Sequence, residues 1–272
     1  MIANARMYSV SPQVAELWGV LLTTVTEQAG IRAAVIEHPA PLPIDELWLR
    51  NDMAAVFMCG LPYSRAQPQP ALIAAPVPSG AEFAGRPEYW SELVVREDSS
   101  FESIEATFGG RLALTLPNSQ SGYAAPLQFL MSRARSVPLY KEIISPAVTP
   151  LGAASAVISG AADVAPVDAF AFQLLQKYRS DLTTQLRSIA RTAKTPIPPL
   201  VASMEGLSRL QTAFTHAHRD IALQPIMAGL LLERFVPARP GDYDALRLNF
   251  EATQAFWLQH KLAEIVHPTF LV

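Results

Sequence analysis

Short apolar runs and longer amphipathic stretches alternate along the chain, and this pattern predicts strands and helices in turn. Residues 11–30 read SPQVAELWGVLLTTVTEQAG and predict a helix, because Ser11 can cap it, Pro12 suits its first turn and Gly30 can end it. The runs at 53–60 and 162–168 are short and mostly apolar, which predicts buried strands. We expect further strands at 31–38, 71–77, 92–98, 111–116, 141–148, 186–191 and 198–203. We expect further helices at 43–52, 99–109, 123–134, 152–160, 169–179, 204–219, 223–232 and 242–260.

This order of elements predicts the fold class and its division into lobes. Strands that alternate with helices are typical of βαβ units, so we expect an α/β fold with mostly parallel sheets flanked by helices. The 23 prolines gather near residues 39–43, 62–78 and 196–199. The last two clusters flank the middle third of the chain, which suggests one lobe inserted into another through two crossings of the chain.

The amino-acid composition of the chain excludes several classes of protein. Half of the 272 residues are hydrophobic and 17% are charged, as in a globular protein. The formal net charge of −3 and the lack of a basic stripe argue against nucleic-acid binding. With Cys59 as the single cysteine, an intramolecular disulfide is excluded. The chain contains no run of about 18 apolar residues, so we expect no membrane-spanning segment. The first residues lack the apolar core of a secretion signal, so a cytoplasmic location stays open beside an exported one.

The stretch LTLPNSQSGYAAPLQFL (114–130) places small polar residues between a predicted strand and a predicted helix. Ligands of parallel sheets bind at the carboxyl ends of the strands, where helix N-termini offer unpaired N–H groups and partial positive charge. Ser119 and Ser121 would add hydroxyl donors, and Gly122 would let an anion approach the backbone. The alternative is a serine-capped helix without a ligand. The loop lacks the Gly-Lys-Ser/Thr of nucleotide-hydrolysing proteins.

Two motifs in order, GRLALTLPNSQSGY (110–123) and SGAADVAPVD (159–168), resemble the phosphate/phosphonate-type solute-binding proteins of ABC transporters. Residues 58–63, 89–110 and 174–203 resemble further segments of that family, so the resemblance covers about residues 5–260. It implies the two-lobed periplasmic-binding-protein type II fold, with lobe one at 1–82 plus 195–272 and lobe two at 83–194. It also implies an anionic ligand held between the lobes without a cofactor, a periplasmic location, and a permease and an ATPase as partners.

The resemblance implies a set of ligand-binding residues at strand ends and in the loop: Ser119, Gln120, Ser121, Gly122, Tyr89, Ser91, Asp168, Tyr8, Gly60 and Thr149. Each has a structural alternative. Asp168 could meet a ligand amine or a protonated phosphoryl oxygen, or it could only cap the next helix. Tyr89 could donate to a phosphoryl oxygen or pack at the crossing between lobes.

One segment departs from the family pattern, and the remaining polar residues suggest no other chemistry. VTPLGAAS (148–155) has Gly152 where a histidine is often expected, which either removes a contact or makes room for a larger ligand. His216 and His218 are spaced two apart on a predicted helix, so they face different directions and make a poor metal site. Cys59 lacks an identifiable catalytic partner, and no carboxylate pair is placed for acid–base work.

The sequence therefore predicts a non-catalytic solute-binding protein of an ABC-type uptake system that takes phosphate, a phosphonate or a related small oxyanion. Two alternatives stay open. A cytoplasmic ligand sensor would fit the first residues of the chain, and a biosynthetic enzyme on the same two-lobed fold would need a reactive group that the sequence does not identify.

Overall fold

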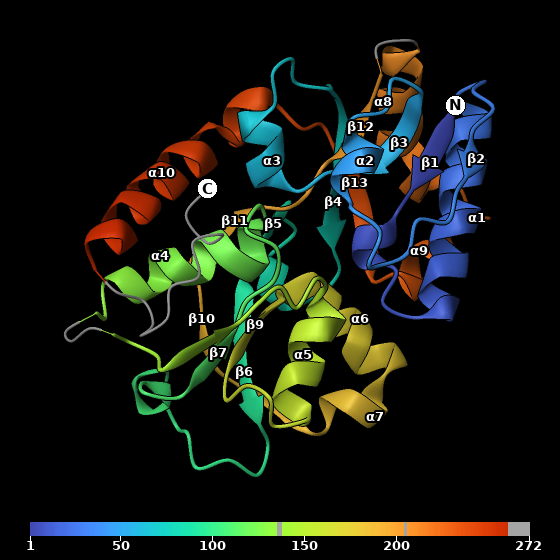
Figure 1. Ribbon diagram of the computed structural model, residues 1–272. Coiled ribbons are helices and arrows are strands. Elements are labelled where there is room, and N and C mark those ends of the chain that lie inside the picture. The colour runs from blue at the N-terminus through green and yellow to red at the C-terminus, as the bar shows by residue number, and fades with distance from the viewer. Residues whose placement is uncertain (135–137, 204–205, 261–272) are drawn as a thin grey trace. The chain divides into compact units, whose positions relative to one another are not determined.

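The computed structural model describes residues 1–134, 138–203 and 206–260, and Figure 1 shows the order of its elements. The chain divides into two compact units. The first unit combines Met1–Tyr89 with Pro196–Asp244, and the second combines Trp90–Thr195 with the described residues that follow Asp244, 245–260. The chain thus passes between the units three times, where the sequence had suggested two crossings.

A six-stranded sheet with the order β13-β4-β12-β3-β1-β2 forms the first unit. β1 is parallel to β2 and β3, whereas β12 is antiparallel to β3 and β4, and β13 is antiparallel to β4. Its strands are β1 (Ile2–Asn4), β2 (Ala34–Val35), β3 (Met53–Phe57), β4 (Ala71–Pro78), β12 (Leu200–Ala202) and β13 (Leu232–Val236). Its helices are α1 (Pro12–Gln28), α2 (Asp45–Trp48), α3 (Gly60–Arg65), α8 (Leu207–His216) and α9 (Gln224–Gly229).

Helix α1 shows how the local sequence builds this unit. The Ser11 hydroxyl accepts a hydrogen bond from the Val14 N–H (3.2 Å), and Pro12 occupies the first turn, as predicted. Its apolar stripe is buried, and Trp18 packs edge-on against Phe57 with ring centroids 5.0 Å apart. Burial of such a stripe against a sheet is the main stabilising contribution of an amphipathic helix.

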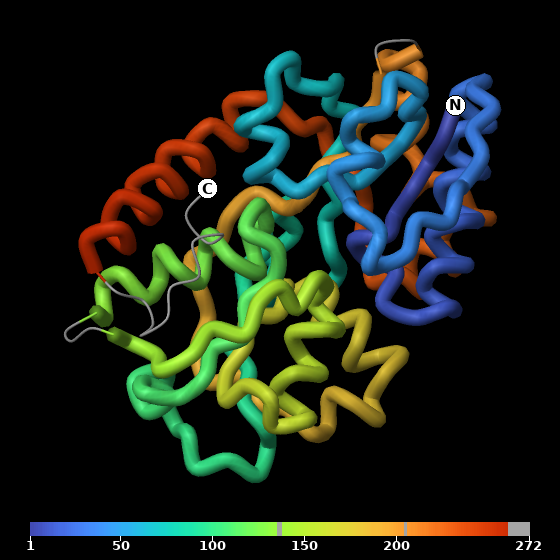
Figure 2. Tube along the Cα trace, in the orientation of Figure 1, coloured from blue at the N-terminus to red at the C-terminus, as the bar shows by residue number. Residues whose placement is uncertain are grey.

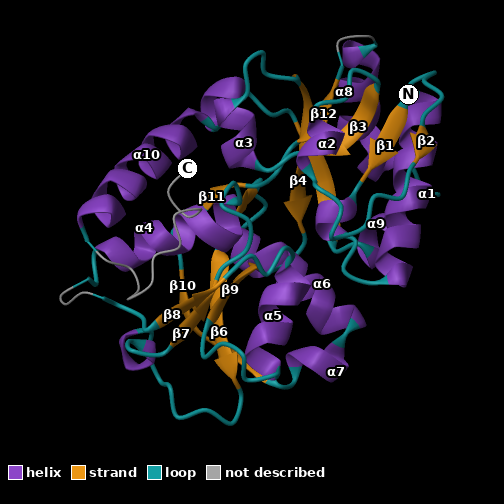
Figure 3. Ribbon diagram, in the orientation of Figure 1, coloured by secondary structure: helices purple, strands orange, loops and turns teal. Residues whose placement is uncertain are grey.

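The second unit contains two smaller sheets. β6 (Ser91–Arg96) lies between β10 (Leu186–Arg191) and β9 (Ala165–Asp168) and is antiparallel to both. β7 (Arg111–Ala113) and β8 (Glu142–Ile144) form a parallel pair, and a parallel bridge between Leu112 and Val164 connects β7 with the segment leading into β9. Figure 3 shows the helices around these strands: α4 (Ala125–Met131), α5 (Pro150–Ile158), α6 (Ala169–Tyr178), α7 (Ser180–Thr183) and α10 (Asp244–Gln259).

Shorter elements complete the chain. β5 (Glu88–Tyr89) and β11 (Thr195–Pro196) form a separate two-stranded sheet. The 3₁₀ turns are η1 (Arg6–Tyr8), η2 (Ala81–Phe83), η3 (Glu105–Thr107), η5 (Ala217–Arg219) and η6 (Pro240–Asp242), and η4 (Gln120–Ala124) is a π-helical turn. Within the described residues, no helix has both the length and the apolar character needed to cross a bilayer.

The α/β fold class is confirmed, but the sheets are mixed in direction instead of mostly parallel. The helix predicted at 99–109 is only the turn η3, because the Ser99 hydroxyl donates back to the Arg96 carbonyl (2.8 Å) and does not cap a helix. The sequence also missed strand β13, whose buried residues Leu232 and Phe235 are three apart because a bulge interrupts the strand. Residues 204–205 of one predicted helix, and the end of the predicted lobe one at 261–272, lie outside the described residues.

The C-terminal helix α10 belongs to the second unit from Ala245 onward, whereas the sequence had assigned this region to lobe one. Its Trp257 indole N–H donates to the Leu127 carbonyl of α4 at 3.1 Å. Figure 2 shows α10 in red beside α4 in green, two segments that lie far apart in the sequence. The other boundaries expected for the lobes remain predictions.

Candidate functional site

Three parallel segments of the second unit lead from their carboxyl ends into helix N-termini. β7 leads to η4 and α4, β8 leads to α5, and β9 leads directly to α6. Ser119, Thr149 and Asp168 cap the three N-termini with a side-chain oxygen. Partial positive charge and unpaired N–H groups therefore collect at this edge of the unit, which is the arrangement that binds anions in α/β proteins.

The predicted anion loop is the N-terminus of η4. Ser119 is extended (φ −81°, ψ 130°), and its hydroxyl oxygen accepts the Gly122 N–H at 3.0 Å. Among the described residues, the Ser119 hydroxyl makes no other hydrogen bond, so its hydrogen is available for a ligand. The Ser121 N–H likewise has no partner within the described part of the chain, as expected in the first turn of a helix. Gln120, also a predicted contact, is buried.

Gly122 serves the packing of the loop. A Cβ atom at this position would lie 1.9 Å from the Thr115 hydroxyl oxygen, and its own N–H is bonded to Ser119. The Gly122 carbonyl accepts the Thr115 N–H at 3.0 Å. Thr115 therefore occupies the space that a side chain at position 122 would need. The role of Gly122 toward an anion stays a prediction. No pattern in the sequence identifies Thr115, because its contact with Gly122 depends on how the loop folds back toward the end of β7.

Asp168 and Ser121 lie together. One carboxylate oxygen of Asp168 accepts the N–H groups of Phe170 and Ala171, both at 2.9 Å, so the predicted helix cap is present. The Ser121 hydroxyl lies 3.5 Å from the other carboxylate oxygen. Asp168 is buried, and it pairs with Ser91 across β6 and β9. A buried carboxylate beside an anion loop favours a ligand that carries a hydrogen-bond donor as well as negative charge.

Ser91, a predicted ligand contact, is hydrogen-bonded within the second unit. Its side chain is fully buried, and its hydroxyl donates to the Ser121 carbonyl at 2.6 Å. Since a serine hydroxyl has one hydrogen, none remains for a ligand. The Ser91 N–H donates to the Thr192 hydroxyl oxygen at 2.9 Å. Thr192 was not identified from the sequence, since a lone threonine after a strand gives no signal.

The segment that departs from the family pattern is explained by local packing. Thr149 caps α5 by accepting the Gly152 N–H at 2.9 Å. A Cβ atom on residue 152 would lie 2.0 Å from the Ala147 carbonyl oxygen. Gly152 is therefore needed for the turn that enters α5, and space for a larger ligand is not required to explain it.

The remaining predicted residues belong to the first unit. Tyr8 is buried and packs edge-on against Phe57, with ring centroids 5.2 Å apart. Gly60 is the first residue of α3, and Tyr89 is buried at the end of β5. The structure thus brings Ser91, Ser119, Ser121 and Asp168 together in one unit, whereas Tyr8, Gly60 and Tyr89 are placed in the other.

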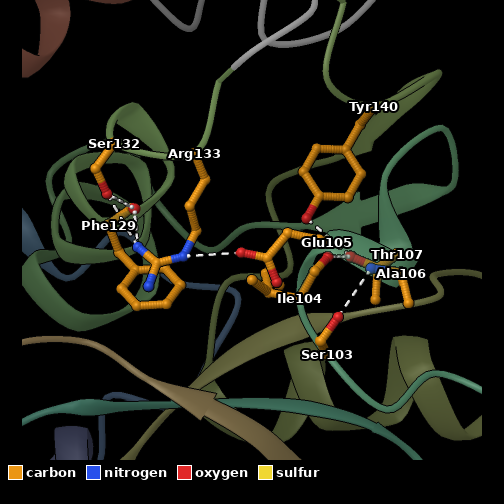
Figure 4. Close-up of polar contacts among 9 residues, drawn as sticks. All are labelled: Ser103, Ile104, Glu105, Ala106, Thr107, Phe129, Ser132, Arg133 and Tyr140. Atoms are coloured by element: carbon orange, nitrogen blue, oxygen red, sulfur yellow. Dashed lines mark hydrogen bonds and ion pairs between the residues drawn. The ribbon is translucent and has the colours of Figure 1, made fainter.

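Both ends of α4 are held in place. Near its start, Tyr123 packs against Phe250 of α10 with ring centroids 6.3 Å apart, and burial raises the pKa of Tyr123 to about 12. Figure 4 shows the other end, where the Arg133 guanidinium lies over the Phe129 ring, donates to the Phe129 carbonyl (2.9 Å) and pairs with Glu105 (3.3 Å). A cation at a helix C-terminus is favourable, so these contacts stabilise the helix that carries the loop.

The described residues contain no group of three His, Cys, Asp or Glu side chains that could hold a metal ion. The segment 117–123 also contains no lysine or arginine. The hydrogen-bonding groups found at this edge are therefore hydroxyls, backbone N–H groups and one carboxylate, which suit the recognition of a small polar anion.

Comparison with known proteins identifies the family. Residues 8–243 match the model of the periplasmic substrate-binding proteins of phosphonate ABC transporters. Among curated proteins, no sequence matches this chain. A binding protein component of an ABC phosphonate transporter from Pseudomonas aeruginosa has a similar structure, with 20% identity and a TM-score of 0.79 over 95% of this chain and 88% of that one.

Two other solved structures share the fold. PhnD1 from Prochlorococcus marinus, in complex with methylphosphonate, is 17% identical with a TM-score of 0.74 over 92% of this chain and 96% of that one. A Xanthomonas citri protein bound to ATP is 18% identical with a TM-score of 0.62 over 95% and 98%. The two-lobed binding-protein fold and the family match agree with the motifs at 110–123 and 159–168. The chain therefore belongs to the periplasmic substrate-binding proteins of phosphonate ABC transporters.

Proposed function

We propose that this protein binds a small phosphonate-type oxyanion at the N-terminus of η4 and delivers it for uptake without chemically changing it. The observation that carries the proposal is the pair of donors at one helix N-terminus, the Ser119 hydroxyl and the Ser121 N–H. The family match and the methylphosphonate complex of the Prochlorococcus marinus protein support the choice of ligand class. A permease and an ATPase would be the partners, and the periplasm the location, as in ABC importers of this family.

The proposed recognition relies on hydrogen bonds to the ligand oxygens more than on basic side chains. The loop has no lysine or arginine, so the helix N-terminus supplies the local positive potential. Asp168 makes the site selective. A fully ionised oxyanion is repelled by its carboxylate, whereas a protonated oxygen or an amine group on the ligand could donate to it.

Replacing both Ser119 and Ser121 by alanine tests the proposal. We expect methylphosphonate affinity to fall by about 1.5–3 kcal/mol, or roughly 10- to 140-fold, because the Ser119 hydroxyl that donates to the charged ligand is lost, whereas the Ser121 N–H is kept. Isothermal titration calorimetry measures the affinity, and chemical denaturation without ligand measures the free energy of unfolding.

Ser103→Ala is the matched control. The Ser103 hydroxyl accepts the Ala106 N–H (3.3 Å), the same three-residue spacing as Ser119 and Gly122, but Ser103 lies just before η3, whose Glu105 pairs with Arg133 after α4 (Figure 4). This control should lower stability slightly and leave affinity unchanged. Equal affinity of the double variant and the wild-type protein would remove the loop from the binding site.

A further inference from the structure

The peptide group between Ser121 and Gly122 is held from both sides. Its carbonyl accepts the Ser91 hydroxyl at 2.6 Å, and its N–H donates to the Ser119 hydroxyl oxygen at 3.0 Å. Because a trans peptide group is planar and its C=O and N–H point in opposite directions, fixing the carbonyl also fixes the direction of the N–H. That N–H occupies one acceptor position of the Ser119 oxygen, so the Ser119 hydrogen is directed elsewhere.

Ser91 is itself fixed at the start of the second unit. Its side chain is fully buried, its N–H donates to the Thr192 hydroxyl oxygen (2.9 Å), and its carbonyl accepts the Thr192 N–H (3.1 Å). Thr192 is also buried. Thr192, directly after β10, therefore holds Ser91 at the start of β6, and Ser91 in turn holds the loop.

We propose that Ser91 is a positioning residue for anion binding, held by Thr192, which orients the Ser119 hydroxyl through the Ser121–Gly122 peptide group. This inference rests on the proposed function, since it assigns Ser91 an effect on a ligand that it does not touch. A loop already held in the binding orientation loses less conformational entropy on binding, so removal of the anchor weakens affinity.

Amide hydrogen exchange of the unliganded protein tests the positioning directly. In Ser91→Ala, the Gly122 amide should exchange about tenfold faster or more, because the peptide group is released on one side. Exchange at Leu200–Ala202 of β12, in the other unit, should stay the same. Unchanged exchange at Gly122 would overturn the inference, whether or not the protein binds an anion.

Calorimetric titration with methylphosphonate tests the consequence for binding. Ser91→Ala should weaken affinity roughly three- to tenfold in the wild-type background but less than about twofold in the Ser119→Ala background, because both changes act through one hydroxyl. Equal losses in the two backgrounds would show that Ser91 does not act through Ser119. If the wild-type protein binds no oxyanion, the proposed function fails, and the exchange experiment still decides the positioning role.

Two further variants separate positioning from general destabilisation. Ser188→Ala removes a hydroxyl that donates to Glu92 on the neighbouring strand, so it should leave affinity and Gly122 exchange unchanged. Ser91→Cys retains a side chain of similar size with a weaker donor and should give a smaller effect in the same direction if Ser91→Ala does not fold. Wild-type exchange and affinity in Ser91→Cys would count against the inference.

Discussion

At the residue scale, two of the helix N-termini at the candidate site have a glycine in the same position relative to the capping residue. Gly122 and Gly152 each donate an N–H to a capping hydroxyl three residues earlier, Ser119 or Thr149. In each case a Cβ atom would lie within 2.0 Å of another atom. Both positions therefore need glycine for packing, whereas the sequence analysis related both glycines to the ligand.

Gly152→Ala tests this explanation. The added methyl group would meet the Ala147 carbonyl oxygen, a backbone atom that moves only if the turn shifts, so we expect a loss of about 2–3 kcal/mol in the free energy of unfolding. Gly19→Ala, inside α1 with nothing within 4 Å of the added atom, should instead increase stability by about 0.5–1 kcal/mol. Urea denaturation measures both, and a neutral or stabilising Gly152→Ala would mean that the position has open space.

At the element scale, the helix that carries the loop depends on α10. The Trp257 indole donates to the Leu127 carbonyl, and Phe250 packs against Tyr123, directly after the loop. The family match ends at residue 243, so α10 lies beyond it. The second unit therefore includes a bracing helix that the sequence predicted at 242–260 but assigned to lobe one.

Replacing Trp257 by phenylalanine should lower the free energy of unfolding by about 1–3 kcal/mol. The variant loses a buried hydrogen bond and leaves a space where the larger indole packed. Leu258→Gln on the same helix is the control, since Leu258 is 64% exposed and its replacement should change stability by less than about 0.5 kcal/mol. Equal stability of Trp257→Phe and the wild-type protein in denaturation would show that α10 does not brace α4.

At the scale of the whole molecule, the sequence predicted the α/β class and the family, because hydrophobic periodicity and motif order are both local properties. It located helix α1 and strand β10 closely, since each has a clear pattern with defined ends. It could not predict the antiparallel partners of β6 or the place of α10, because both depend on contacts between segments far apart in the chain.

The candidate site was predictable to a similar degree. Ser119, Ser121 and Asp168 follow strands and precede helices, so their positions could be read from the order of elements. The hydrogen bonds that connect this loop with Ser91, and Ser91 with Thr192, could not be predicted from the sequence. Ser91 bonds to Ser121, 30 positions away, and to Thr192, 101 positions away, and bonds over such distances leave no local sequence pattern.

The central claim is that the full chain binds a phosphonate-type oxyanion, and calorimetric titration of the wild-type protein tests it most directly. Methylphosphonate, inorganic phosphate, an aminoalkyl phosphonate and sulfate form the panel. We expect saturable binding of at least one phosphoryl compound and weaker binding of sulfate, which carries no proton at neutral pH to donate to Asp168. A ligand at about 100 times its Kd should also stabilise the folded protein by roughly 2.7 kcal/mol. Binding of sulfate alone, or of none of the four compounds, would contradict the account.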